Sequence, residues 1–389
     1  MESFGAMMLA DLPPAGDRID TSNSLPPPEY PGYRSLWLNS GTAALALALL
    51  HARRQLPNIS TPQVIIPAYG CPDLVAAAVY AGVTPVVADI GLDDPGFDLE
   101  VLRSSLNSHT IAVMAVNFLG IRERVEAIKA ILPPGVFLLE DNAQWHPELN
   151  GSVNLLGDYV ITSFGRGKPA SVLGGGLLLL RDGLEFDPDW LTQHARTSNS
   201  ESPLVRLRYR VKTGLYNLLR QPRFYYWLNR NPFLNLGETR YKPVADIGTM
   251  TPSSRALVAA NVRRLLAADR WREKRYDGIF ADLPTVTPLA LKWSSRRGRL
   301  LRYPLVCDNG HQRDRLLGAL QRQGLGASAM YRRPLLSISG VAGQAVAYEN
   351  PRHAEGFARS LLTLPVHSGV SRQHIDRIGI ISREIFESG

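Results

Sequence analysis

The sequence predicts an α/β fold: a three-layer arrangement with a mostly parallel sheet between helices, joined to a smaller C-terminal α/β domain. Short apolar runs alternate with helix-favouring segments between residues 35 and 165, which is typical of a doubly wound parallel sheet. The chain has 389 residues and is 45% hydrophobic, enough for a large core and two domains. A second set of helix and strand patterns follows residue 250.

The expected elements follow one another in order. Strands are predicted at 35–38, 64–67, 84–90, 111–120, 136–141 and 158–164, and helices at 43–54, 73–82, 99–107 and 124–132. After residue 250 the patterns predict one long helical stretch at 253–280, a strand at 299–307, and helices at 311–324 and 371–386. We therefore expect an irregular N-terminal arm (1–34), a large domain (35–250) and a small domain (251–389).

Composition excludes several classes of protein. Cys71 and Cys307 are the only cysteines, so neither a disulfide framework nor a structural zinc site is expected. The N-terminus lacks a basic segment followed by a long apolar one, and no apolar run reaches membrane-spanning length. These features predict a cytoplasmic protein without a metal site.

The formal net charge of +8 comes from one segment. Residues 196–242 hold ten basic and two acidic residues and form a basic aromatic insertion, while the rest of the chain is formally neutral. A protein that binds specific nucleic acid is therefore not expected. Within 203–242, Arg alternates with Tyr, Phe, Trp and Leu. Three interpretations remain open: peripheral contact with the inner face of an anionic membrane, a substrate-covering or subunit-crossing segment, and a helical insertion with packed aromatics and solvated arginines.

Two predicted strands end in polar chemistry. Residues 136–139 lead into Glu140-Asp141-Asn142-Ala143-Gln144, and residues 159–163 lead into Phe164-Gly165-Arg166-Gly167-Lys168 and a glycine triplet. Ligands of open α/β sheets lie beyond the carboxyl ends of the strands, so Asp141 and Lys168 are expected to face a common crevice. A third segment, Ser40-Gly41-Thr42, begins a helix whose free N–H groups suit a phosphate.

The residues around Lys168 do not fit a Walker phosphate-binding loop. The segment before Lys168 has Thr162 where a Walker loop begins with glycine, and Pro169 where it needs Ser or Thr. A lysine, a strand-end carboxylate and a phosphate cradle are the parts that a pyridoxal phosphate enzyme needs. The alternatives at this point are that Lys168 and Asp141 are surface charges and that Ser40 or Thr42 only caps the helix. Asp89, at another strand end, is interpreted as a solvated acid, and His367 as a surface-loop histidine.

The motifs resemble those of the DegT/DnrJ/EryC1/StrS family of sugar aminotransferases, fold-type-I pyridoxal phosphate enzymes. The resemblance covers most of residues 35–380. Its motifs are Ser40-Gly41-Thr42-Ala43-Ala44-Leu45 (SGTxAL), Pro67-Ala68-Tyr69, Glu140-Asp141-Asn142-Ala143-Gln144 (EDxAQ), Ser163-Phe164 with Lys168 (SFxxxK) and, in the small domain, RYPLV, the segment from Tyr331 to Leu335 and SLLTLPVHSGV.

The resemblance implies a role for each site residue. Lys168 would bind the cofactor aldehyde covalently and shuttle the reaction's proton, Asp141 would pair with the pyridine nitrogen, and Gln144 would bond the phenolic oxygen. The Gly41 backbone, Thr42 and Ser163 would hold the phosphate. One departure concerns the cofactor ring: the family commonly places an aromatic residue at the position of Cys71, so that either Tyr69 compensates here or the ring is stacked more weakly.

The resemblance also implies an activity. An amino donor, usually glutamate, would charge pyridoxal 5'-phosphate, and the amino group would pass to a keto group on a nucleotide-linked sugar for polysaccharide or glycoconjugate synthesis. The enzyme would be a homodimer. Two alternatives remain: another reaction on the same cofactor, either sugar dehydration or cyclitol amination, and a non-catalytic relative that binds membrane or nucleic acid. The lysine at position 168 argues against dehydration, because the family's dehydratases have histidine at this position.

Overall fold

The structure is a computed structural model that describes residues 10–22, 26–149, 155–185, 187–196, 201–231 and 239–387. Parts of the predicted arm (1–9 and 23–25) and of the basic aromatic insertion (197–200 and 232–238) lie outside the described residues. Among the described helices, none combines the length and the apolar character that crossing a bilayer requires.

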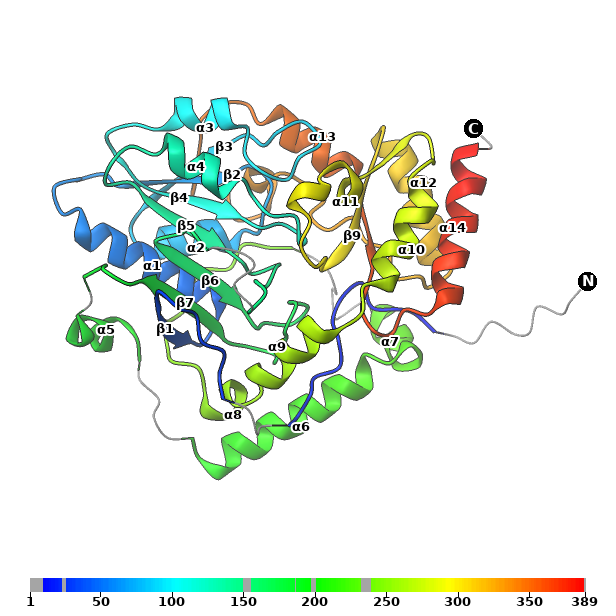
Figure 1. Cartoon of the computed structure of the whole chain (residues 1–389), viewed down its shortest axis with the longest axis horizontal. Helices are drawn as coiled ribbons and strands as arrows, with labels where there is room; N and C mark the ends of the chain where they lie inside the picture. The colour runs from blue at the N-terminus through cyan, green and yellow to red at the C-terminus, as the bar shows by residue number, and fades with distance from the viewer. Residues whose placement is uncertain are drawn as a thin grey trace, which may run out of the picture.

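A large sheet runs through the first half of the chain (Figure 1). β7 is antiparallel to both of its neighbours, and the other strands share one direction. In spatial order the strands are β1 (Tyr33–Leu38), β7 (Gly176–Arg181), β6 (Tyr159–Ser163), β5 (Phe137–Asp141), β4 (Thr110–Val116), β2 (Gln63–Pro67), β3 (Thr84–Ala88) and β10 (Val346–Ala347). The predicted mostly parallel sheet is confirmed.

Helices cover both faces of this sheet. Successive strand residues point to opposite faces, so Val64 and Ile66 pack with α1 (Gly41–Gln55) and α2 (Asp73–Tyr80), while Ile65 packs with α3 (Leu99–Ser105) and α4 (Val125–Ile131). The strands are buried on both sides, which explains their continuous apolar runs. The three-layer α/β prediction is therefore confirmed. A short helix, α5 (Pro188–His194), follows the last strand of this part.

A second sheet lies in the C-terminal part. It is antiparallel and consists of β11 (Leu361–Pro365), β9 (Arg302–Cys307) and β8 (Val286–Pro288). The helices of this part are α10 (Trp271–Phe280), α11 (Leu289–Lys292), α12 (Gly310–Arg322), α13 (Arg352–Ser360) and α14 (Arg372–Glu387). Because β10 pairs with β3, the C-terminal part also contributes a strand to the large sheet.

The single long helix expected at 253–280 is wrong. The structure has three helices there: α8 (Pro252–Arg255), α9 (Val258–Ala267) and α10. Between the last two, the Asp269 carboxylate accepts a hydrogen bond from the Trp271 N–H at 2.8 Å, which starts a new helix instead of continuing the old one. Apolar spacing alone does not register such a break.

Two polar residues expected at the surface are buried. Asp89 accepts hydrogen bonds from the N–H groups of His353 (2.8 Å) and Ala354 (2.9 Å), so it binds the first turn of α13. His367 lies within 2.8 Å of the Pro13 carbonyl oxygen through its Nε2 atom. Both partners are more than 250 positions away in the sequence, which is why local patterns misplace these side chains.

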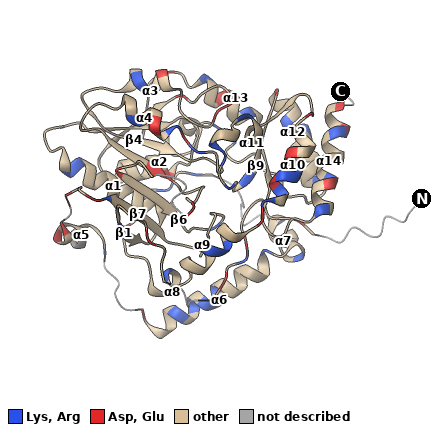
Figure 2. Ribbon diagram, viewed as in Figure 1, with Lys and Arg blue, Asp and Glu red and all other residues tan. Residues whose placement is uncertain are grey.

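The described part of the basic aromatic insertion contains two helices, α6 (Pro203–Leu219) and α7 (Pro222–Asn229). α6 runs along the outer edge of the molecule beside α8 (Figure 1), and blue segments along it mark its basic residues (Figure 2). The N-terminal arm lies against its inner side, where Asn217 exchanges hydrogen bonds with the main chain of Ile19. The described residues of the arm contain no helix or strand before Tyr33.

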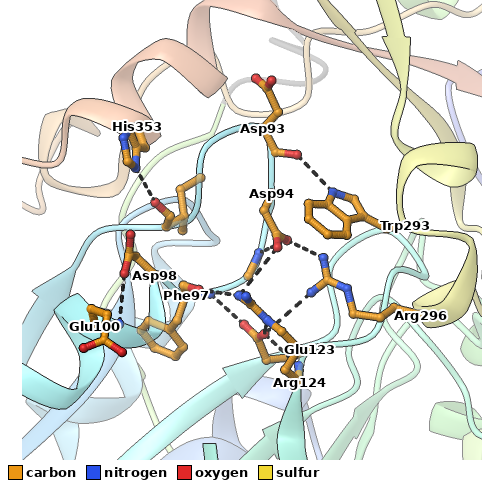
Figure 3. A network of polar contacts seen from close by, with 12 residues as sticks. Asp93, Asp94, Phe97, Asp98, Glu100, Glu123, Arg124, Trp293, Arg296 and His353 are labelled. Carbon is orange, nitrogen blue, oxygen red and sulfur yellow. Dashed lines mark hydrogen bonds and ion pairs between the residues drawn. The ribbon is translucent and has the colours of Figure 1, made fainter. Parts of the chain in front are cut away.

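An ion cluster joins the large sheet to the C-terminal part (Figure 3). It comprises Asp94, Glu123, Arg124 and Arg296, and we call it the Arg296 ion cluster. Arg296 donates to Asp94 at 2.7 Å and lies 3.8 Å from Glu123, and Arg124 lies 3.3 Å from Glu123. Both carboxylates are almost fully buried. Their burial makes the pairing of each charge a requirement of the fold.

Candidate active site

The buried carboxylate of Asp141 lies at the carboxyl end of β5. One of its oxygens accepts a hydrogen bond from the Ala143 N–H at 2.8 Å. Burial raises the pKa of Asp141, while the positive charge of Lys168 and the Ala143 hydrogen bond lower it. The positive charge of Lys168 therefore acts on the Asp141 carboxylate, although the two residues follow the ends of different strands. They are not the separate surface charges of the alternative interpretation.

The start of α1 lies directly against the end of β6. A Cβ atom on Gly41 would lie 2.8 Å from Ser163 Cβ, closer than real Cβ atoms come, so only glycine fits. Ser40 caps the helix, since its hydroxyl accepts from the Ala43 N–H at 3.0 Å. Thr42 is the half-buried second residue of the same helix. Gly41, Thr42 and Ser163 thus meet at a helix N-terminus, where the helix dipole favours an anion.

Lys168 lies in the tight loop between β6 and β7. Its main-chain N–H donates to the Gly165 carbonyl oxygen at 3.2 Å, and the Gly165 N–H lies 3.4 Å from the Ser163 hydroxyl oxygen. Ser163 and Lys168 are therefore held by one turn. The glycine triplet that follows gives close approach: a Cβ on Gly176 would lie 2.3 Å from the Ser40 carbonyl oxygen.

Gln144 and Tyr69 meet at Tyr331 of the C-terminal part. Gln144 accepts a hydrogen bond from the Leu119 N–H at 3.2 Å and donates to the Tyr331 hydroxyl at 3.3 Å. The hydroxyl of Tyr69 donates to the Tyr331 carbonyl oxygen at 2.8 Å, and its ring is fully buried. Burial raises the pKa of the neighbouring Cys71 thiol to about 12, so this side chain stays neutral. Tyr69 binds the two parts of the chain together here, whatever its contact with a cofactor.

A cavity of about 340 Å³ opens beside Lys168. Its walls come from the turn after β6, the arm, the α9–α10 connection and the C-terminal part, and basic residues outnumber acidic ones among them. The charged and histidine residues that line it are Asp17, Arg18, His146, Lys168, Arg264, Asp269, Arg270, Arg272, Glu273, Arg299 and His367.

Two of these arginines bind neutral partners. Arg272 donates to the carbonyl oxygens of Val370 (2.7 Å) and Ser368 (3.0 Å), and Arg299 donates to those of Ala268 and Leu266. Main-chain oxygens orient the guanidinium groups without cancelling their charge. The cavity is therefore suited to an anionic ligand.

Sequence reasoning missed this cavity wall. Its arginines are spread through the segments predicted as irregular arm, long helix and strand, and no local motif links them to Lys168. Tyr331 belongs to a segment that resembles the family, but no local pattern marks its hydroxyl as a partner of the site. The partner of Gln144 could have been found only from the contact between the two parts of the chain, which no spacing in the sequence reports.

The residues at this site fit pyridoxal 5'-phosphate on structural grounds. The charge of an amine acts on a buried carboxylate, an amide side chain is hydrogen-bonded to the Tyr331 hydroxyl, and a helix N-terminus with a glycine too crowded for a Cβ lies at the adjacent strand end. Asp141, Gln144 and Lys168 are available for the ring, and Gly41, Thr42 and Ser163 for the phosphate. In the described part of the chain, no group of three His, Cys, Asp or Glu residues could hold a metal ion.

The chain belongs to the DegT/DnrJ/EryC1/StrS aminotransferase family. The sequence model of this family matches residues 33–196 and 253–381. The unmatched interval between them contains α6 and α7, so the insertion is not part of the family's common sequence pattern. A comparison with curated protein sequences finds no match.

Solved structures of the same fold include several sugar aminotransferases. The putative sugar aminotransferase Spr1654 from Streptococcus pneumoniae in its PLP form is 18% identical, covers 91% of this chain and 87% of its own, and has a TM-score of 0.64. Helicobacter pylori PseC, an aminotransferase of pseudoaminic acid biosynthesis, is 20% identical with coverages of 92% and 87% and a TM-score of 0.66. These likenesses confirm the fold-type-I architecture.

The same fold also carries a different reaction. The E. coli GDP-4-keto-6-deoxy-D-mannose-3-dehydratase with bound hydrated PLP is 16% identical, covers 90% of this chain and 88% of its own, and has a TM-score of 0.66. The family and these structures support pyridoxal 5'-phosphate as the cofactor of this chain.

Proposed function

We propose that this protein is a pyridoxal phosphate-dependent aminotransferase that moves an amino group from an amino acid to a keto group of a nucleotide-linked sugar. One observation carries the proposal: Lys168 lies in the electrostatic field of Asp141 and also lines the arginine-rich cavity. The amine that would bind the cofactor therefore also faces a space suited to an acidic substrate. Both glutamate and a sugar nucleotide are acidic.

Each residue of the site has a part in this chemistry. When bound, pyridoxal phosphate supplies a carbonyl that takes up the amino group and a ring that accepts electrons. Asp141 would hold a proton on the ring nitrogen, because a buried carboxylate strongly favours a neighbouring positive charge. Gln144 would hold the phenolic oxygen, and Gly41, Thr42 and Ser163 the phosphate. Lys168 Nζ would carry the proton between the two reacting carbons.

The charge of the cavity supports acidic substrates. Arg272 and Arg299 donate to main-chain carbonyl oxygens in the wall of the cavity that Lys168 also lines. They would hold the carboxylates of glutamate in one half-reaction and the diphosphate of the sugar nucleotide in the other. Burial lowers the pKa of His146 and His367 to about 4, so both are neutral at pH 7 and the positive charge is that of the arginines and Lys168.

The test is a comparison of Lys168→Ala with Lys274→Ala, a substitution of an exposed lysine on α10. The unaltered protein and Lys274→Ala should show the visible absorption band of a lysine-bound cofactor, and Lys168→Ala should lack it. Borohydride reduction followed by peptide mass spectrometry should place the cofactor on Lys168. A band that survives in Lys168→Ala and still shifts with pH would contradict the assignment.

A second measurement separates transamination from dehydration or cyclitol amination on the same cofactor. Glutamate added to the purified protein should remove the visible band and release 2-oxoglutarate in proportion to the enzyme. Failure with every common amino donor would favour the other reactions. The proposal includes a homodimer, and light scattering of the purified protein at the working concentration measures this.

A further inference from the structure

The outer face of α6 carries an apolar stripe exposed to solvent. Leucine and valine side chains recur on it at intervals of three or four residues, which places them on one side of a helix. The side chains are half exposed or more in most cases: Leu204 (73%), Leu207 (58%), Val211 (61%), Leu215 (50%) and Leu218 (43%). We call these five residues the α6 stripe. α7 adds Trp227, which is 68% exposed.

The opposite face of α6 is the one that packs on the protein. Thr213 is buried there, the Tyr209 hydroxyl donates to the Val172 carbonyl oxygen at 2.8 Å, and Tyr216 packs in the core cluster of the arm and β1. At 3.6 residues per turn, these positions lie about half a turn from the stripe. The helix therefore has two apolar faces, and only one of them is used by the fold.

Basic residues flank the stripe on both sides. With the same helical spacing, Arg210 lies along one edge and Arg208 and Lys212 lie along the other, whereas Arg206, seven residues before Thr213, lies nearer the packed face. From Ser202 to Asn231 the sequence has seven Arg and Lys residues and no acidic one. Figure 2 shows this as blue segments along α6.

We propose that α6 and α7 dock the enzyme on an anionic lipid surface. An apolar stripe, two basic edges and a nearby tryptophan are the arrangement of helices that lie in the membrane interface. The stripe would enter the boundary between headgroups and acyl chains, while the flanking arginines and lysine meet lipid phosphates. The helix lies along the outer edge of the molecule and is backed by the arm and α8, so it can reach such a surface without unfolding (Figure 1).

The charges favour lipid over a second copy of the chain. A symmetric pair joined through this stripe would bring the basic edges of two α6 helices together, and neither α6 nor α7 has a carboxylate to compensate them. A nucleic acid would match the charge but not the leucines and valines at the centre of the face. Only a surface that is both anionic and apolar matches both the basic edges and the apolar stripe of α6.

The experiment measures sedimentation of the full-length protein with vesicles. Vesicles of phosphatidylcholine with one-third phosphatidylglycerol should bind at least about tenfold more tightly than pure phosphatidylcholine, and added salt should reduce the difference. Val211→Asp/Leu215→Asp should weaken binding to the anionic vesicles at least about tenfold. The matched control is Ile380→Asp on α14, whose side chain is 50% exposed like that of Leu215 and which should bind like the unaltered protein.

Two control measurements separate a loss of lipid binding from misfolding or a change of oligomeric state. Light scattering should give the same oligomeric state for all variants, and the visible cofactor band should be retained, which shows that the variant is folded. Arg208→Gln/Lys212→Gln should bind more weakly and with a smaller salt dependence. The proposal is overturned if Val211→Asp/Leu215→Asp splits the oligomer, which would make the stripe a subunit interface, or if it binds anionic vesicles as well as Ile380→Asp does.

Discussion

Burial shifts the pKa values of the titratable side chains near Lys168 and thereby affects which of them are charged. Asp141 is held between the effect of burial, which raises its pKa, and the amine of Lys168, which lowers it. His367 has its Nε2 atom 2.8 Å from the Pro13 carbonyl oxygen, and its Nδ1 accepts from the Gly369 N–H at 3.1 Å. A neutral ring satisfies both contacts, whereas a charged ring would lose the second. The histidine is thus built into the junction of the arm and the C-terminal part.

We expect the His367 contact to make stability fall in acid. Burial lowers the pKa of His367 to about 4, so between its ordinary pKa of 6.5 and that value the unfolded chain binds a proton that the folded chain does not. The contribution is complete above pH 6.5 and is lost as pH falls toward 4, by up to about 3 kcal/mol. His367→Gln should show a smaller drop in melting temperature between pH 7 and pH 5 than the unaltered protein, whereas His311→Gln, on an exposed position, should not. Equal drops in all three would refute the role.

The residues of the site are positioned by close contacts between the ends of helices and strands. α1 begins against the last residue of β6, and Gly41 leaves room for this. The sequence predicted the helix start, the two strand ends and the glycines, because each has a local signature. It left open whether Ser40 caps the helix or holds an anion, and the structure shows that it caps.

Gly41→Ala tests this contact. Alanine is the better helix former, but its Cβ would lie 2.8 Å from Ser163 Cβ, so α1 or β6 must shift. We expect a loss of about 1–3 kcal/mol in the free energy of unfolding and weaker binding of pyridoxal phosphate. Gly278→Ala in α10 meets nothing within 4 Å and should stabilise the protein by about 0.4–1 kcal/mol. Denaturant unfolding and spectroscopic titration of the cofactor measure both, and a Gly41→Ala protein that matches Gly278→Ala would contradict the expectation.

The whole molecule depends on contacts between the large sheet and the C-terminal part. The loop after β4 runs beside residues 296–301, and a Cβ on Gly120 would lie 2.3 Å from the Arg299 carbonyl oxygen. The same loop supplies the Leu119 N–H that holds Gln144. The Arg296 ion cluster closes this junction (Figure 3). The contact between the large sheet and the C-terminal part is therefore coupled to the geometry of the site through a single loop.

Arg296→Met tests the Arg296 ion cluster. The substitution keeps the length of the side chain but leaves Asp94 without its closest partner in a buried place, and we expect a loss of about 3 kcal/mol or more in the free energy of unfolding. Lys292→Met breaks an exposed pair with Asp93 and should cost less than about 1 kcal/mol. Chemical denaturation of both variants at the same pH gives the comparison. If both variants lose a similar free energy of unfolding, the buried cluster stabilises the protein no more than an exposed ion pair does.

The layers of the fold and the strand ends could be predicted from the sequence because apolar periodicity and strand-end polarity are local properties of the chain. The family and its cofactor could be predicted because the motifs around Ser40, Asp141 and Lys168 resemble those of the family. The tertiary structure alone decided what lies around them. The arginines beside Lys168, the link from Gln144 to Tyr331 and the burial of Asp89 and His367 all join residues far apart in sequence. It also decided which face of α6 packs and which stays exposed, since a helix with two apolar faces gives no local sign of the one that the fold will use.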